Sequence, residues 1–97
     1  MGHKEKIANT VIRRETREDD THSYTYELTV SESQSTSSFR IPLYSIGVEM
    51  TDKLGQVRTG KVKEAFADPG RAILFFNKVV QNLATPIDLV YIVEDEL

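Results

Sequence analysis

The most recognisable chemistry lies in the segment GQVRTGKV, residues 55–62. It fits the pattern G-x-x-x-x-G-K, in which glycine-rich backbone amides and a lysine hold phosphates. Val62 stands where that pattern needs Ser or Thr for magnesium, and the next helix signal, Asp68, comes too late. We interpret the segment as a strand of a hairpin. A small-ligand or nucleotide site at Gly55–Lys63 is the alternative.

A local basic stripe overlaps this segment. It contains four cations and no acid, namely Lys53, Arg58, Lys61 and Lys63. Such a stripe attracts phosphates or an acidic protein, but it has no aromatic residue for base stacking. Lysines on an exposed strand also protect a sheet edge from pairing with other chains. We expect a solvated face that can contact a protein, and we do not expect nucleic acid as a partner.

A polar turn holds the remaining candidates for metal binding or acid–base chemistry. Glu18, Asp19, Asp20 and His22 offer oxygen and imidazole groups, but their spacing matches no calcium loop or zinc helix. His22 is the only histidine beyond the first three residues, so a catalytic triad has no visible partner for it. The acidic run 94–96 could supply a general acid and a general base, but solvated carboxylates need no such role. We predict no metal, no cofactor and no enzymatic activity.

Two apolar residues of the helix that follows lie outside its core-facing stripe. Its core-facing stripe is formed by residues at spacings of 4, 3 and 4, namely Ala72, Phe76, Val79 and Leu83. Leu74 points the opposite way, and Phe75 lies at the margin of the stripe. One exposed leucine is ordinary. The alternative is that Leu74 and Phe75 form a contact surface for the terminal segment or a second subunit.

Composition limits what these residues can do. The chain has 97 residues, a net charge of -3 and no cysteine. The absence of cysteine excludes disulfides, thiolate zinc sites and thiol nucleophiles, and it favours the reducing cytoplasm. The longest apolar runs, 72–76 and 89–93, are far shorter than the roughly 20 residues that span a bilayer. We expect one domain at 7–97, no membrane association and a disordered N-terminus at 1–6.

Four strands are predicted to precede the helix. Alternating apolar and polar residues mark 23–30 and 44–50 as strands with one solvated face. Residues 7–17 indicate a charged edge strand, and 56–66 a returning strand after a turn at Gly55. Gly60 is predicted to be a bulge, because Val57 and Val62 fall on opposite parity. The run SESQSTSS, 31–38, is predicted to be a mobile linker. Tyr24 and Tyr26 are core residues of the second strand, or else a stacking platform.

Two Pro-containing steps predict helix starts. Asp68-Pro69 supplies a cap and a residue that needs no amide partner. Thr85-Pro86, with Asp88 three residues after Thr85, repeats the arrangement. The periodicity of 86–96 fits a helix with Leu89, Val90, Val93 and Leu97 on one face, and it also fits a strand. The cap favours the helix, whereas the acidic end opposes it.

Short motifs resemble a family of small, functionally uncharacterised proteins from Firmicutes, mainly clostridia. The resemblance rests on YSIGVE, NLATPIDL and VED, at 44–49, 82–89 and 93–95, and it covers mainly the C-terminal half. It implies a bacterial cytoplasmic domain with a C-terminal helix after the Thr-Pro step, and it implies no functional residues.

The sequence as a whole predicts an α+β domain, with an antiparallel sheet of three to four strands followed by a core helix and a short C-terminal helix on one face. The function that we expect is a non-enzymatic protein-interaction or regulatory module. Its partner is another protein or a second copy of the chain.

Overall fold

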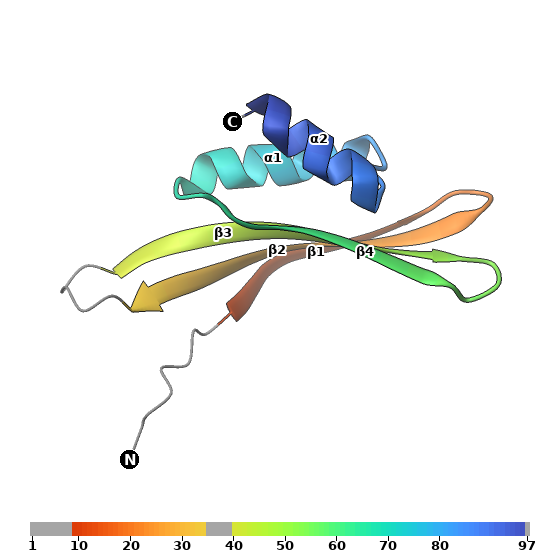
Figure 1. The fold of residues 1–97 in the computed structure, drawn as a ribbon, viewed down its shortest axis with the longest axis horizontal. Helices are drawn as coiled ribbons and strands as arrows, with labels where there is room; N and C mark the ends of the chain where they lie inside the picture. The colour runs from red at the N-terminus through yellow and green to blue at the C-terminus, as the bar shows by residue number, and fades with distance from the viewer. Residues whose placement is uncertain (1–8, 35–39, 97) are drawn as a thin grey trace, which may run out of the picture.

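The computed structural model describes residues 9–34 and 40–96. It contains four strands, β1 (Asn9–Glu18), β2 (His22–Gln34), β3 (Arg40–Asp52) and β4 (Val57–Phe66), followed by helices α1 (Pro69–Gln81) and α2 (Pro86–Glu96). The strands form one antiparallel sheet in the order β1-β2-β3-β4, so β1 and β4 are its edges. Both helices cover the same face of this sheet (Figure 1). The predicted α+β class and the helical assignment of 86–96 are confirmed.

Alternation along the two central strands produces the core. The side chains of Tyr26, Leu28 and Ile46 are fully buried beneath the helices, as predicted for the apolar positions of these strands. Their polar neighbours point to the open face, as at Thr25 and Glu27. Buried side chains from both helices complete the core, namely Ala72, Phe75, Phe76, Val79, Val80 and Leu89.

The serine-rich segment is partly a strand, not a linker. Residues 31–34 continue β2 and pair in register with 40–43 of β3. Backbone pairing needs no apolar side chains, and Ser31 is buried, with its hydroxyl 3.5 Å from the carbonyl oxygen of Leu43. The linker prediction is therefore wrong for 31–34. Residues 35–38 lie outside the described residues, as does the predicted disorder at 1–6.

The irregularity of β4 lies near its end. Val62 pairs with Ile46 and Phe66 pairs with Tyr44, so β4 advances four residues while β3 advances two. Within this stretch Glu64 adopts a φ of 53°, in the left-handed region. Its amide donates to the buried hydroxyl of a β3 serine at 2.8 Å, which satisfies a donor that the strand ladder does not use. Beyond this irregularity β4 continues to Phe66, and α1 begins at Pro69.

Gly60 is not the bulge that the sequence predicted. It pairs regularly with Val48, and Val57 is exposed, so the opposite parity of Val57 and Val62 reflects the two faces of the sheet. A Cβ atom at Gly60 would lie 2.8 Å from both the Cα and the carbonyl oxygen of Pro86. Real Cβ contacts are not that short, so this glycine lets the start of α2 lie directly on β4.

Candidate protein-interaction surface

The predicted basic stripe does not form one surface. Arg58 pairs with Met50, on the helix-covered side of the sheet, whereas Lys61 pairs with Gly47, on the open side. Lys53 lies in the preceding turn and Lys63 in the irregular part of β4. All four side chains are exposed. Strand alternation thus separates Arg58 from Lys61, whereas Lys61 and Lys63 line one shared hollow together with the acidic Glu64.

The phosphate-binding pattern is dispersed in the same way. Gly55 ends the tight turn between β3 and β4 with a φ of 86°, and Gly60 lies beneath Pro86. Lys61 follows within a strand, and the next helix begins only at Pro69. Phosphate-binding loops need free backbone amides at a helix start, which this arrangement does not supply.

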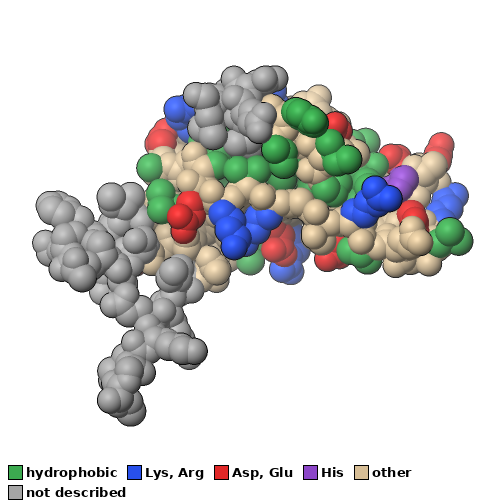
Figure 2. All heavy atoms as spheres, viewed as in Figure 1, with side chains coloured by type: hydrophobic (Ala, Val, Ile, Leu, Met, Phe, Trp, Pro, Cys, Tyr) green, Lys and Arg blue, Asp and Glu red, His purple; other side chains and the backbone are tan. Residues whose placement is uncertain are grey.

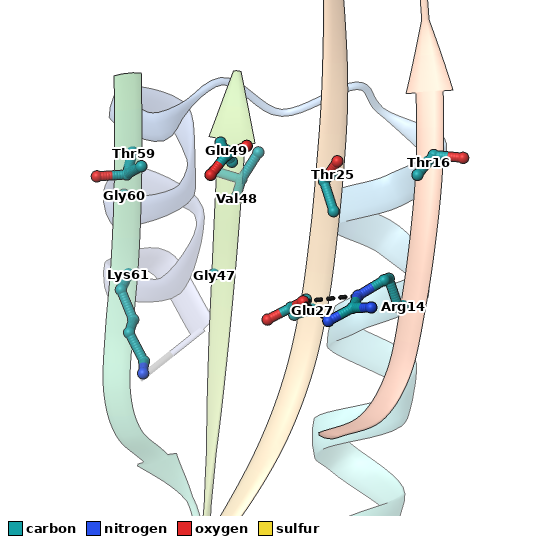
Figure 3. Close-up of a pocket in the computed structure, with 10 residues that line it drawn as sticks. All are labelled: Arg14, Thr16, Thr25, Glu27, Gly47, Val48, Glu49, Thr59, Gly60 and Lys61. Carbon is teal, nitrogen blue, oxygen red and sulfur yellow. Dashed lines mark hydrogen bonds and ion pairs between the residues drawn. The ribbon is translucent and has the colours of Figure 1, made fainter. Parts of the chain in front are cut away.

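The open face of the sheet carries a solvent-exposed hollow of about 500 Å³. Two cross-strand rows line it, one with Arg14, Glu27, Gly47 and Lys61 and the other with Thr16, Thr25, Glu49 and Thr59 (Figure 3). The Arg14 Nε atom donates to Glu27 Oε2 at 2.7 Å. Gly47, which has no side chain, separates Glu27 from Lys61 in this row (Figure 3). Most of the side chains that line this hollow are polar, as expected for the solvated side of a sheet covered on one face.

In the polar turn between β1 and β2, the carboxylate of Asp19 accepts hydrogen bonds from the turn itself and from β2. Asp19 accepts hydrogen bonds from the amides of Thr21 and His22, each at 2.8 Å, and from the hydroxyl of Tyr24 at 2.9 Å. These donors hold the pKa of Asp19 well below its usual range, because they stabilise the ionised form. Within 9–34 and 40–96, no three His, Asp or Glu side chains gather as a metal site. Asp19 thus stabilises the turn.

The two tyrosines of β2 serve the core. Tyr24 and Tyr26 stack at a centroid distance of 6.0 Å, and both are buried, which confirms the core interpretation over a stacking platform. The Tyr26 hydroxyl donates to the carbonyl of Ala84 at 2.9 Å, in the link between the helices. Burial raises the pKa of Tyr26 to about 12, since the phenolate would lose its hydration. This hydrogen bond ties the sheet to the start of α2.

Of the two α1 residues outside the predicted core-facing stripe, Leu74 and Phe75, only Leu74 is exposed enough to contact a partner. Leu74 is 71% exposed, whereas Phe75 is 5% exposed and packs against Phe66 at a centroid distance of 5.2 Å. The alternative interpretation, in which Phe75 belongs to a partner surface, is therefore wrong for this residue. Phe66 is the last residue of β4, where it pairs with Tyr44, and its ring covers the helix margin at Phe75. Leu74 is left beside Arg71 and Lys78, around a small hollow.

A larger apolar surface lies on α2, outside the residues that the sequence pattern indicated for partner contact. Ile87, Val90 and Tyr91 are 63%, 43% and 64% exposed, and their i, i+3, i+4 spacing puts them on one helix face. We call these three residues the α2 outer face. Figure 2 shows hydrophobic side chains gathered over the first half of α2. The sequence predicted Leu89 and Val90 on one helix face, but the structure separates them, since Leu89 is fully buried and Val90 is exposed.

Local interactions fix the direction of the α2 outer face. The Thr85 hydroxyl accepts from the amide of Asp88 at 3.1 Å, while the Asp88 carboxylate accepts from the amide of Thr85 at 3.3 Å. This reciprocal cap confirms the predicted helix start. Leu89 is fully buried, and the first residue of the helix, Pro86, lies on Gly60. With its inner side anchored, the helix presents the opposite side to solvent.

The chain matches a protein-family model over most of its length. The model of a family of unknown function (DUF6514) matches residues 5–97. The match therefore includes the N-terminal half of the chain as well as the C-terminal motifs. Neither curated proteins nor solved structures give a significant match. No helix in the described part of the chain is long and apolar enough to cross a membrane.

Proposed function

The chain belongs to the DUF6514 family, whose function is unknown, and we propose that it is a non-enzymatic protein-interaction module that binds its partner through the α2 outer face. The observation that carries the proposal is the exposure of Ile87, Val90 and Tyr91 on a helix whose other side is anchored. Aromatic and branched apolar side chains on a rigid element are typical anchors of protein interfaces.

The charge of α2 indicates the chemistry of the partner. The helix contains four acids and no base, since Asp88 and the run 94–96 are its only charged residues. An apolar stripe within an acidic helix favours a partner helix with apolar residues and flanking lysines or arginines, since potentials across interfaces are complementary. We propose a basic amphipathic helix as the partner segment. A bacterial source in the Firmicutes and a cytoplasmic location belong to the same proposal.

The surface can be tested by affinity capture from the native cell with matched serine variants. Ile87→Ser and Tyr91→Ser remove parts of the α2 outer face. Leu74→Ser and Leu54→Ser remove leucines that are 71% and 87% exposed elsewhere. We expect the first pair to lose the captured partner by at least roughly tenfold, as interface anchors do, and the second pair to retain it. Equal capture by all four variants would exclude this surface.

A further inference from the structure

Edge strand β1 is open to pairing along its whole length. It lies at the end of the sheet, and every one of its residues is exposed. Its register with β2 shifts between Val11 and Arg13 and is regular from Arg13 to Glu18, where the turn begins. Such an edge presents unpaired amides and carbonyls to any strand of matching chemistry.

The charges of this regular stretch are antisymmetric about Thr16. Residues 13–19 read RRETRED, which in charge is + + − 0 + − −. Reversing the order exchanges every cation with an anion. An antiparallel copy of the same strand, centred on Thr16, therefore meets opposite charges at every charged position from Arg14 to Glu18.

We propose that two copies of the chain pair through β1, antiparallel, about a twofold axis at Thr16. In this register Glu15 faces Arg17 of the second copy, and Arg14 faces its Glu18. Each pair occurs twice, by symmetry. Opposite charges directly across an antiparallel pair stabilise it, and like charges destabilise it. Arg13 and Asp19 fall outside this pairing, because Asp19 lies beyond the end of β1 and its carboxylate is hydrogen-bonded within the turn.

Neighbouring registers lack this match. Centring the pair on Glu15 places Arg13 across from Arg17, and centring it on Arg17 places the two Arg17 residues across from each other. Both arrangements oppose like charges. The other edge strand, β4, has three cations and one acid and is irregular before Phe66, so it does not complement itself. The charge pattern therefore selects both the strand and the register.

The fold leaves room for this pairing. A twofold axis perpendicular to the sheet keeps all four helices on one side, and α1 contacts β2, β3 and β4 (Figure 1). The β2 strands of the two copies are separated by three strand spacings, about 14 Å. Packed helices need only about 8–10 Å between their axes. Because α2 contacts β4 and β3, the α2 outer face of each copy stays exposed.

A cysteine at the twofold axis tests the register directly. The chain contains no cysteine, so Thr16→Cys introduces a single thiol. Directly opposed residues of antiparallel strands have Cα atoms about 4.5–5.5 Å apart, within the range that a disulfide bridges. Thr59→Cys is the matched control, since Thr59 is an exposed residue of the same cross-strand row on β4. We expect rapid oxidative dimerisation of Thr16→Cys only. Equal rates for both variants would overturn the proposal.

Charge reversal tests the pairing without a covalent bond. Glu15→Arg creates two repulsive pairs per dimer and is expected to weaken dimerisation roughly tenfold. Glu15→Arg combined with Arg17→Glu restores opposite charges and should recover the affinity. Glu49→Arg makes the same charge change on the open face of β3 and should have no effect. Light scattering over a concentration series measures each variant against the 11.0 kDa monomer. Failure of the double variant to recover would contradict the proposed register.

Discussion

Substitution of Gly60 by alanine is the sharpest test of how α2 is positioned. The added Cβ would lie 2.8 Å from two Pro86 atoms and 2.9 Å from a third. Two of these atoms are backbone, so relief requires movement of the start of α2 or of β4. Overpacking of this kind costs about 1–3 kcal/mol. Alanine normally gains about 0.5–1 kcal/mol over glycine in a strand, which offsets part of that cost. The difference is a net loss of roughly 0–2.5 kcal/mol, with about 1 kcal/mol as the central value.

Gly47→Ala is the matched control for this measurement. A Cβ at Gly47 meets its nearest neighbour, the carbonyl oxygen of Gly60, at an ordinary 3.6 Å. This variant should be as stable as the natural chain or slightly more stable. Urea denaturation gives both free energies of unfolding, and thermal melting should show a decrease of about 4–8 °C per kcal/mol for Gly60→Ala. A Gly60→Ala protein as stable as Gly47→Ala would refute the close approach of Pro86 to β4.

Three further predictions concern hydrogen bonds around the turn and the helix link. Tyr26→Phe removes the donor to the Ala84 carbonyl and should lower the free energy of unfolding in urea by about 1–2 kcal/mol; a loss below about 0.3 kcal/mol would contradict a buried bond. Burial raises the pKa of Tyr26 to about 12, so the neutral Tyr26 hydroxyl stabilises the fold below pH 10 and this stabilisation is lost as the pH rises from 10 through 12. In Tyr26→Phe the free energy of unfolding should therefore decline less over the same pH range. Asp19 has a lowered pKa, so its stabilisation is present above the unfolded value of 3.8 and is lost as the pH falls below it. Asp19→Asn should therefore lower the free energy of unfolding at pH 7, and this free energy should fall less than that of the natural chain as the pH is lowered below 3.8. If the variant lost as much stability in acid as the natural chain, the proposed role of the Asp19 carboxylate would be excluded. Thr85→Ala removes half of the reciprocal cap and should cost about 1 kcal/mol, measured by urea denaturation; no change would show that α2 is held by packing alone.

The elements whose side chains alternate or repeat clearly were predictable from the sequence. Tyr24, Tyr26 and Leu28 alternate with polar residues and lie in β2 with their rings or methyl groups in the core. Asp68 caps α1 through the amide of Arg71 at 3.2 Å, as its position before a proline predicted. These signals are local, because they depend on the period of one element or on the hydrogen bonds of one helix end.

The errors arose where a distant element decides the outcome. The segment 31–34 looks like a linker by composition, yet it is a strand because 40–43 pair with it. Phe75 is buried because Phe66 covers it, and Gly60 is needed because Pro86 lies on it. Neither contact has a signature in the local sequence.

The candidate surface was missed for a related reason. Leu89 and Val90 are adjacent apolar residues, and the α2 periodicity allows either of them to face the sheet. The position of Pro86 on β4 fixes the rotation of the helix and sends Leu89 inward, so Ile87, Val90 and Tyr91 face outward. The signal in the sequence is that a rotation of the helix with Leu89 facing the sheet places the α2 outer face toward solvent.

Site-specific photocrosslinking tests the proposed interaction most directly. A photoreactive phenylalanine analogue replaces Tyr91, and the same analogue at Leu54, which is 87% exposed in the hairpin turn, serves as the control. Mass spectrometry then identifies the crosslinked peptide. The proposal predicts one adduct, formed only from position 91, with a partner helix that carries apolar residues and flanking lysines or arginines. Identical adducts from both positions, or no adduct from position 91, would contradict binding through the α2 outer face.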